Sequence, residues 1–150
     1  MNDLPVTEFM ERGPISAKRE MLLTELVALF TRHGYRALPV TDDENHVIGV
    51  VSETDLFLKE HTVPFSTERI PSLLGQMIDK QEIDHVKATH RMTVAEVMTG
   101  RVTTVGESAT LEDVALLMCS HHLAMVPVVQ DKKLIGVVRR RDVLGILYRT

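Results

Sequence analysis

The chain contains the same pattern twice, and this internal duplication constrains its fold more than any other feature. An L-P-V run at 38–40, a V-I-G-V-V-S run at 47–52 and Asp55 return as V-P-V at 126–128, L-I-G-V-V-R at 134–139 and Asp142. Pro127 follows Pro39 by 88 residues (127 − 39), and Asp142 follows Asp55 by 87 (142 − 55). Each copy has a length at which a lone domain buries too little surface to be comfortably stable. We therefore expect a pseudo-twofold pair with two equivalent small-molecule clefts where the copies meet.

The composition is that of a soluble globular chain: 150 residues, 44% hydrophobic, 25% charged and a net charge of −4. We expect a cytoplasmic location, since no apolar run approaches the roughly 20 residues that cross a bilayer. The single Cys119 agrees with a reducing compartment and is predicted to be a buried small hydrophobe. The negative total charge indicates no broad basic face, so nucleic-acid binding is not expected from it.

Secondary structure repeats with the duplication. Apolar residues at helical spacing predict helices over 22–33 and 111–122, each ending in histidine. Two short β-branched runs follow each helix, joined by polar turns at 42–45 and 130–133, and predict two hairpins. Short helices are expected over 53–59 and 140–148, and short strands near 15–16 and 102–105. The predicted class is α/β (α+β), with β-α-β-β-α in each copy.

The spacing of the two copies divides the chain into three segments. V-A-E-V-M at 94–98 echoes V-T-E-F-M at 6–10, so the second repeat is placed at 94–150 and the first at 1–59. Residues 60–93 interrupt the symmetry, and their apolar content predicts a structured insertion that packs on the pair.

These marks, repeated in register, resemble the tandem cystathionine beta-synthase (CBS) domain pair across nearly the whole chain. The resemblance implies two β-α-β-β-α CBS repeats that share two cleft sites, and frequent assembly into a flat homodimer. It also implies regulation by an adenosine-containing ligand such as AMP, ADP, ATP, S-adenosylmethionine or NAD.

The segment from Gly49 to Asp55 predicts the first ligand site. Asp55, at the start of a helix, could accept hydrogen bonds from both ribose hydroxyls, and Ser52 with the following amides could face a phosphate. The alternative is an ordinary helix start, in which Ser52 and Asp55 form a cap. By resemblance, Arg36 faces the phosphate and the second copy supplies the base pocket. The predicted site residues are Val50, Ser52, Thr54, Asp55, Arg36, Val102, Thr103, Leu123 and Ala124.

The second site departs from the first, because Arg139 stands where Ser52 stands in the first copy. Three successive arginines at a helix N-terminus oppose the helix dipole unless an anion lies nearby. One hypothesis is that Arg139 reaches a phosphate or Asp142, so that the site prefers a polyphosphate or is plugged by its own side chain. The alternative is a solvated basic turn. The predicted residues of this cleft are Asp142, Arg139, Arg141, Pro14, Ile15 and Tyr35, with Arg36 shared.

Other chemistry finds little support in the sequence. The seven histidines show no metal-ligand spacing, and neither a nucleophile motif nor a glycine-rich phosphate loop is present. We therefore expect no catalytic residue, no metal and no catalytic cofactor. Two alternatives stay open: a protein-interaction scaffold that recruits an unknown regulated protein through residues 60–93, and nucleic-acid binding through 139–141.

Overall fold

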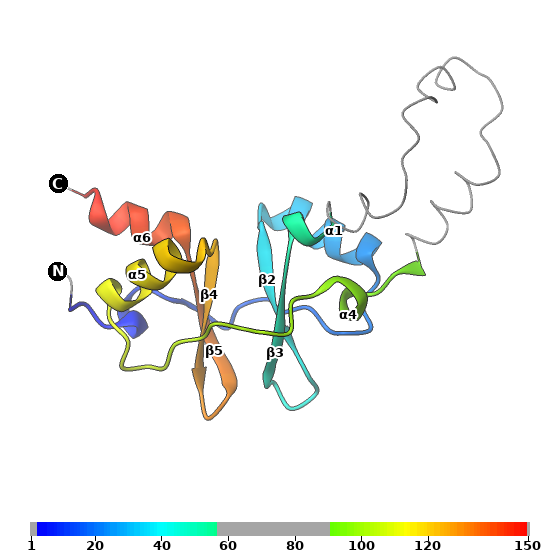
Figure 1. Ribbon diagram of the computed structural model, residues 1–150, viewed down its shortest axis with the longest axis horizontal. Coiled ribbons are helices and arrows are strands. Elements are labelled where there is room, and N and C mark those ends of the chain that lie inside the picture. Colours follow the sequence, from blue (N-terminus) through cyan, green and yellow to red (C-terminus); the bar gives the residue numbers. More distant parts are fainter. Residues whose placement is uncertain (1–2, 57–90, 150) are drawn as a thin grey trace, which may run out of the picture.

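The computed structural model of the chain describes residues 3–56 and 91–149, which form two similar halves side by side (Figure 1). The first half holds helix α1 (Leu23–His33) and the hairpin of β2 (Ala37–Thr41) and β3 (Val47–Ser52). The second holds α5 (Leu111–His121), the hairpin of β4 (Met125–Gln130) and β5 (Lys133–Arg139), and α6 (Arg140–Leu147). The predicted mixed α/β fold with two repeats is confirmed.

The two hairpins repeat one another in register. In the first, Ala37 pairs with Ser52, and in the second Met125 pairs with Arg139. The register shifts directly after Val40 in the first hairpin and after the equivalent Val128 in the second. The predicted strands before the long helices are single bridges, in which Ala17 pairs in parallel with Val40 and Val105 with Val128. The duplication seen in the sequence is therefore a duplication of backbone geometry.

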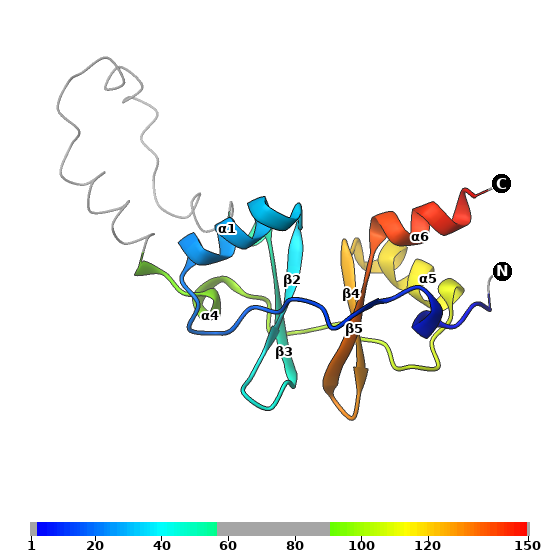
Figure 2. The ribbon, with the colours of Figure 1, turned by 180° about the vertical axis from the view of Figure 1, so that it is seen from behind.

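The opening segment of each copy packs on the other copy's half (Figure 2). The 3-10 turn η1 (Val6–Glu8) and strand β1 (Glu11–Arg12) lie on the second half, where β1 pairs with β5 and the Val6 amide donates to the Ala109 carbonyl at 2.8 Å. Helix α4 (Val94–Val97) lies on the first half, where the Val94 amide donates to the Met21 carbonyl at 2.8 Å. This exchange ties the halves together.

The hydrophobic core reflects the exchange. One cluster combines η1 with α5, β4, β5 and α6, and a second combines α1, β2 and β3 with α4. A third cluster joins the two hairpins and contains Ala37, Met125, Leu134 and Val137. The expectation that the copies complete one another's core is met by this shared apolar surface, whose burial is the main favourable term in folding.

The ends of the long helices follow the predicted pattern. Both end in histidine, and the next residues, Gly34 and His122, adopt left-handed conformations with φ of 66° and 54°. Glycine takes this conformation without steric cost, which makes it a common residue after a helix. α5 begins after the cap residue Thr110, whose hydroxyl accepts from the Asp113 amide at 3.3 Å.

One expectation is wrong: Cys119 is exposed. The buried positions of α5 are Leu111, Val114 and Met118, so Cys119 falls outside that stripe. Of the short helix expected over 53–59, residues 53–56 are helical, and the rest lies outside the described residues, as does nearly all of the insertion at 60–93. Within 3–56 and 91–149, no helix has the length and apolar character to cross a membrane.

Candidate functional site

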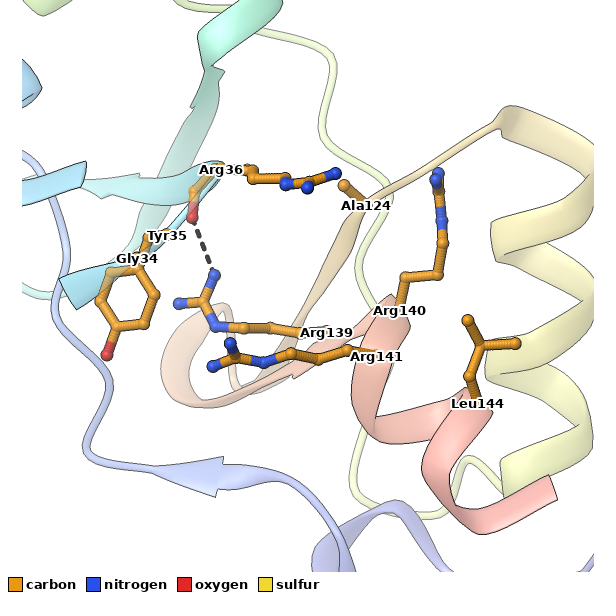
Figure 3. Close-up of a pocket in the computed structure, with 9 residues that line it drawn as sticks. Gly34, Tyr35, Arg36, Ala124, Arg139, Arg140, Arg141 and Leu144 are labelled. Carbon is orange, nitrogen blue, oxygen red and sulfur yellow. Dashed lines mark hydrogen bonds between the residues drawn. The ribbon is translucent and has the colours of Figure 1, made fainter. Parts of the chain in front are cut away.

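A pocket of about 350 Å³ opens between the two halves (Figure 3). The first copy contributes the connection from α1 to β2, and the second contributes the residue before β4 and the start of α6. Its lining, named here the arginine pocket, consists of Gly34, Tyr35, Arg36, Ala37, Ala124, Arg139, Arg140, Arg141 and Leu144. Arg36 and Ala124 are equivalent positions of the duplication, 88 residues apart. Equivalent positions of the two copies therefore line one pocket.

Backbone hydrogen bonds hold the two walls in place. The Arg140 amide donates to the Ala124 carbonyl at 2.9 Å, and the Glu53 amide donates to the Arg36 carbonyl at 3.0 Å. Helix α1 ends at the left-handed residue Gly34, just before Tyr35. Lining residues on both sides are thus fixed by the ends of regular elements, which position side chains more precisely than long loops do.

Arg139 crosses from the second half to the first. Its Nη1 donates to the Ala37 carbonyl at 3.0 Å, its Nε donates to Glu11 Oε2 at 3.4 Å, and its guanidinium carbon lies 3.8 Å from the centre of the Tyr35 ring. The Tyr35 hydroxyl donates to Glu11 Oε1 at 3.0 Å. The Arg139 side chain is 8% exposed, and its Nη2 is buried with no hydrogen-bond partner in the described part of the chain.

These contacts revise the interpretation of the arginine run. The Arg139 side chain reaches Glu11 and Ala37 rather than Asp142, which instead accepts the Arg139 backbone amide at 3.3 Å. A solvated basic turn is wrong for Arg139 and describes only the exposed Arg140 and Arg141. The physical reason is that Arg139 ends a strand facing the other half, whereas the next two residues begin a helix.

The remaining arginines of the pocket differ in their partners. Arg140 donates from Nε and Nη2 to the Leu123 carbonyl at 3.2 and 2.8 Å. Arg36 and Arg141 are exposed, and neither side chain has a hydrogen bond or ion pair with another described residue. Arginine remains protonated throughout the physiological range, so the pocket presents several cations.

Tyr35 forms the apolar wall beside these cations. Burial raises the pKa of its phenol, and the hydrogen bond to Glu11 raises it further. The His33 ring stacks on it with centroids 5.2 Å apart. Tyr35 is therefore held as a neutral, oriented ring that supports the Arg139 guanidinium.

Ser52 and Asp55, the residues predicted to hold the ribose and phosphate at the first site, lie beside the arginine pocket and do not line it. Asp55 Oδ2 accepts from the Ser52 amide at 2.8 Å and from the Ser52 hydroxyl at 3.1 Å, which is the capping geometry. Ser52 pairs with Ala37, a lining residue. Ser52 and Asp55 are both half-buried, and Thr54 is exposed.

The other predicted residues are dispersed. The Val50 backbone exchanges hydrogen bonds with Thr99 at 3.0 and 2.9 Å, so this position binds the second copy's opening segment. The structure brings five predicted residues to one pocket from the two clefts proposed: Tyr35, Arg36, Ala124, Arg139 and Arg141. The others do not line it: Pro14, Ile15, Val50, Ser52, Thr54, Asp55, Val102, Thr103, Leu123 and Asp142.

Sequence reasoning missed the partner of Arg139. Three cations at a helix start indicated that an anion lies nearby, but Glu11 is 128 residues away in sequence. Only the exchange of opening segments brings it there. Ala37 and Leu144 were likewise not singled out as lining residues, because their strand and helix patterns have ordinary structural meanings.

Comparison with known proteins yields a consistent set of matches. A family model described as the CBS domain matches residues 6–61 and 94–149. The uncharacterized protein MJ1426 of Methanocaldococcus jannaschii is 26% identical over 149 residues, covering 91% of this chain and 87% of that protein. The chain spans only 22%, 32% and 42% of the next three curated relatives, the first of them an L-aspartate semialdehyde sulfurtransferase from the same organism.

Solved structures agree with the family match. CBSX2, a protein of Arabidopsis thaliana, in complex with AMP is 25% identical with a TM-score of 0.73, covering 96% of each chain. The CBS domain pair of protein MJ0100, in complex with 5-methylthioadenosine and S-adenosyl-L-methionine, is 22% identical with a TM-score of 0.69 and covers 95% of this chain and 94% of that one. The second likeness concerns the fold.

Proposed function

The chain belongs to the CBS domain family, with two copies of the domain, and on that premise we propose that it is a regulatory module that binds an adenosine-containing ligand between its repeats. The observation that carries this proposal is the arginine pocket, because both copies line it and a ligand there contacts both at once. Its volume of about 350 Å³ lies in the range of small-molecule sites. CBSX2, solved with AMP, provides a related example of such a complex.

The proposed contacts keep the residues expected from the sequence. Asp55 has accepting capacity left after its two bonds from Ser52, since a carboxylate offers about four lone-pair sites, and we assign it to the ribose hydroxyls. Arg36 is assigned to phosphate. The base would lie against the second copy's wall, where Ala124 lines the arginine pocket. Val102, Thr103 and Leu123, the other residues proposed for the base, lie outside that lining.

The regulatory role is proposed with three further properties. The module acts without catalysis of its own, on a regulated protein that nothing on the chain identifies. It forms a homodimer, for which exposed apolar residues of α6 and the residue after it (Leu144, Leu147 and Tyr148) offer surface. It works in the cytoplasm, a reducing compartment that suits a chain with a single cysteine.

Thermal unfolding against AMP, ADP, ATP, S-adenosylmethionine and NAD tests the proposal. A ligand that binds only the folded chain raises its stability by about 2.7 kcal/mol at 100 times its dissociation constant. We expect a concentration-dependent increase in Tm with at least one member of the panel. A flat panel would contradict the proposal and favour the interaction scaffold.

Two matched variants test the ribose assignment. Asp55→Asn removes the charge but keeps an oxygen that can accept the Ser52 amide, and Asp142→Asn makes the same change at the equivalent cap of the second copy. We expect Asp55→Asn alone to lower ligand affinity, while both unfold near the wild-type Tm without ligand. Equal losses in both variants would contradict the assignment.

A further inference from the structure

The arginine pocket carries more positive charge than a monophosphate neutralises. Glu11 compensates Arg139 through the 3.4 Å contact, which leaves Arg36, Arg140 and Arg141 as three cations around one pocket. A phosphate monoester carries about two negative charges at neutral pH. Like charges gathered in a partly enclosed site repel one another more strongly than in water, because the effective dielectric constant is lower there.

The hydrogen-bonding state of these side chains points the same way. Arg36 and Arg141, from opposite walls, have no hydrogen-bond or ion-pair partner among residues 3–56 and 91–149, so their donors are free to meet a ligand. Arg139 lies on the same wall as Arg141, and its Nη2 is buried without an acceptor in the described structure. A buried donor that lacks an acceptor is costly, so Arg139 adds to the unsatisfied cationic character of this wall.

No carboxylate lines the pocket among the described residues. Glu11, the acid that pairs with the Arg139 side chain, is already engaged by Arg139 and by Tyr35. A cationic ligand such as S-adenosylmethionine would therefore meet only like charge here. A ligand with two or three phosphates would supply about three or four negative charges, which matches the three uncompensated arginines.

We propose that the arginine pocket selects a nucleoside di- or triphosphate over the monophosphate, and excludes S-adenosylmethionine. This inference rests on the proposed function, because it specifies the ligand class of the same pocket. The pocket contains equivalent positions of both copies, Arg36 and Ala124, so one ligand in it contacts both copies.

Isothermal titration of the intact chain, in buffer with a chelator, tests the selectivity with ADP, AMP, adenosine and S-adenosylmethionine. We expect ADP to bind roughly tenfold or more tightly than AMP, the effect of one added charge-assisted contact. ADP should lose affinity steeply as salt rises. Adenosine and S-adenosylmethionine should give no measurable heat at the same concentrations.

Arg36→Gln and Arg141→Gln test the residues that carry the claim, since both side chains are exposed and their removal leaves the core intact. Each should weaken ADP more than AMP, so that the ADP-to-AMP affinity ratio falls toward one. Arg19→Gln is the matched control, because Arg19 is exposed and precedes α1, whereas the pocket lies at the end of that helix. It should leave both affinities unchanged.

The outcomes separate this inference from the proposed function. Equal affinities for AMP and ADP, or tight binding of S-adenosylmethionine, would overturn the charge selectivity and leave an adenosine sensor standing. Binding of inorganic pyrophosphate that both variants weaken, with no response to any nucleotide, would support the polyanion pocket and reject the adenosine ligand. No binding of nucleotide or pyrophosphate would reject both.

Discussion

The guanidinium of Arg139 lies over the ring of Tyr35, 3.8 Å from its centre, and so a side chain of the second copy rests on an aromatic side chain of the first. Glu11 contacts both residues, with one carboxylate oxygen for each. These three residues come from an opening segment, a helix end and a strand end. Together they make a polar contact across the interface between the halves.

Loss of this contact should destabilise the chain. Arg139→Ala removes a nearly buried cation together with its hydrogen bonds to the Ala37 carbonyl and to Glu11 Oε2, so we expect the free energy of unfolding to fall by about 2–4 kcal/mol. Denaturant titration measures this loss. Arg140→Ala is the control, because Arg140 is exposed and bonds only a carbonyl, and its effect should stay below about 1.5 kcal/mol. Equal losses in both variants would refute the bridging role of Arg139.

The exchanged opening segments pass very close to two equivalent glycines. A Cβ at Gly49 would lie 2.9 Å from Met98 Sδ and 3.0 Å from the Thr99 carbonyl oxygen, and one at Gly136 would lie 2.5 Å from Met10 Sδ and 3.0 Å from the Glu11 carbonyl oxygen. The methionines can move, but the backbone oxygens of the paired segments cannot do so without loss of their contacts. We expect each alanine variant to lose about 1–3 kcal/mol, with Gly136→Ala the more severe.

Gly145→Ala is the comparison for these variants. Nothing lies within 4 Å of a Cβ there, and Gly145 is inside α6, so alanine should leave stability unchanged or raise it by up to about 1 kcal/mol. Thermal unfolding of the three variants measures the contrast. Wild-type stability in Gly49→Ala and Gly136→Ala would mean that the opening segments do not pack on the opposite halves.

Tyr35 should titrate above the ordinary tyrosine range. Burial and the hydrogen bond to Glu11 favour the neutral phenol and raise its pKa in the folded chain. The unfolded chain releases this proton near pH 10. The stabilisation is therefore fully present below about pH 10 and is lost as pH rises through the higher pKa of the folded state.

Ultraviolet absorbance of tyrosinate follows this titration in Tyr148→Phe, where Tyr35 is the only tyrosine of the chain. Adding Glu11→Gln removes the negative charge beside the phenol and should shift the midpoint to lower pH. A Tyr35 midpoint at or below the ordinary value in the folded protein would contradict the buried contact.

Cys119 should react readily with a thiol reagent in the native state. The side chain is exposed on α5, whereas the sequence placed it in an apolar stretch and predicted burial. We expect one thiol per folded chain to be modified at nearly the rate seen in denaturant. Protection in the native chain would contradict the exposed position of Cys119.

Local patterns accounted for much of the fold. The helical spacing that ends at His33 and His121, the two hairpins and the cap at Thr110 all depend on residues within one turn or one strand pair of each other. The position of Ser52 and Asp55 at a helix start was likewise readable from their spacing of three. The candidate site was harder to predict, because its lining combines residues that the sequence analysis had assigned to two separate clefts.

The amino-acid sequence alone determined that two equivalent units exist, where their helices and strands lie, and that an arginine run replaces the serine of the first unit. Only the tertiary structure decided that each opening segment packs on the other unit, that Glu11 meets Arg139, and that Arg36 and Arg141 face a common pocket. The reason is physical: hydrogen-bond and apolar periodicity act over a few residues, whereas those three outcomes depend on how two complete surfaces fit together.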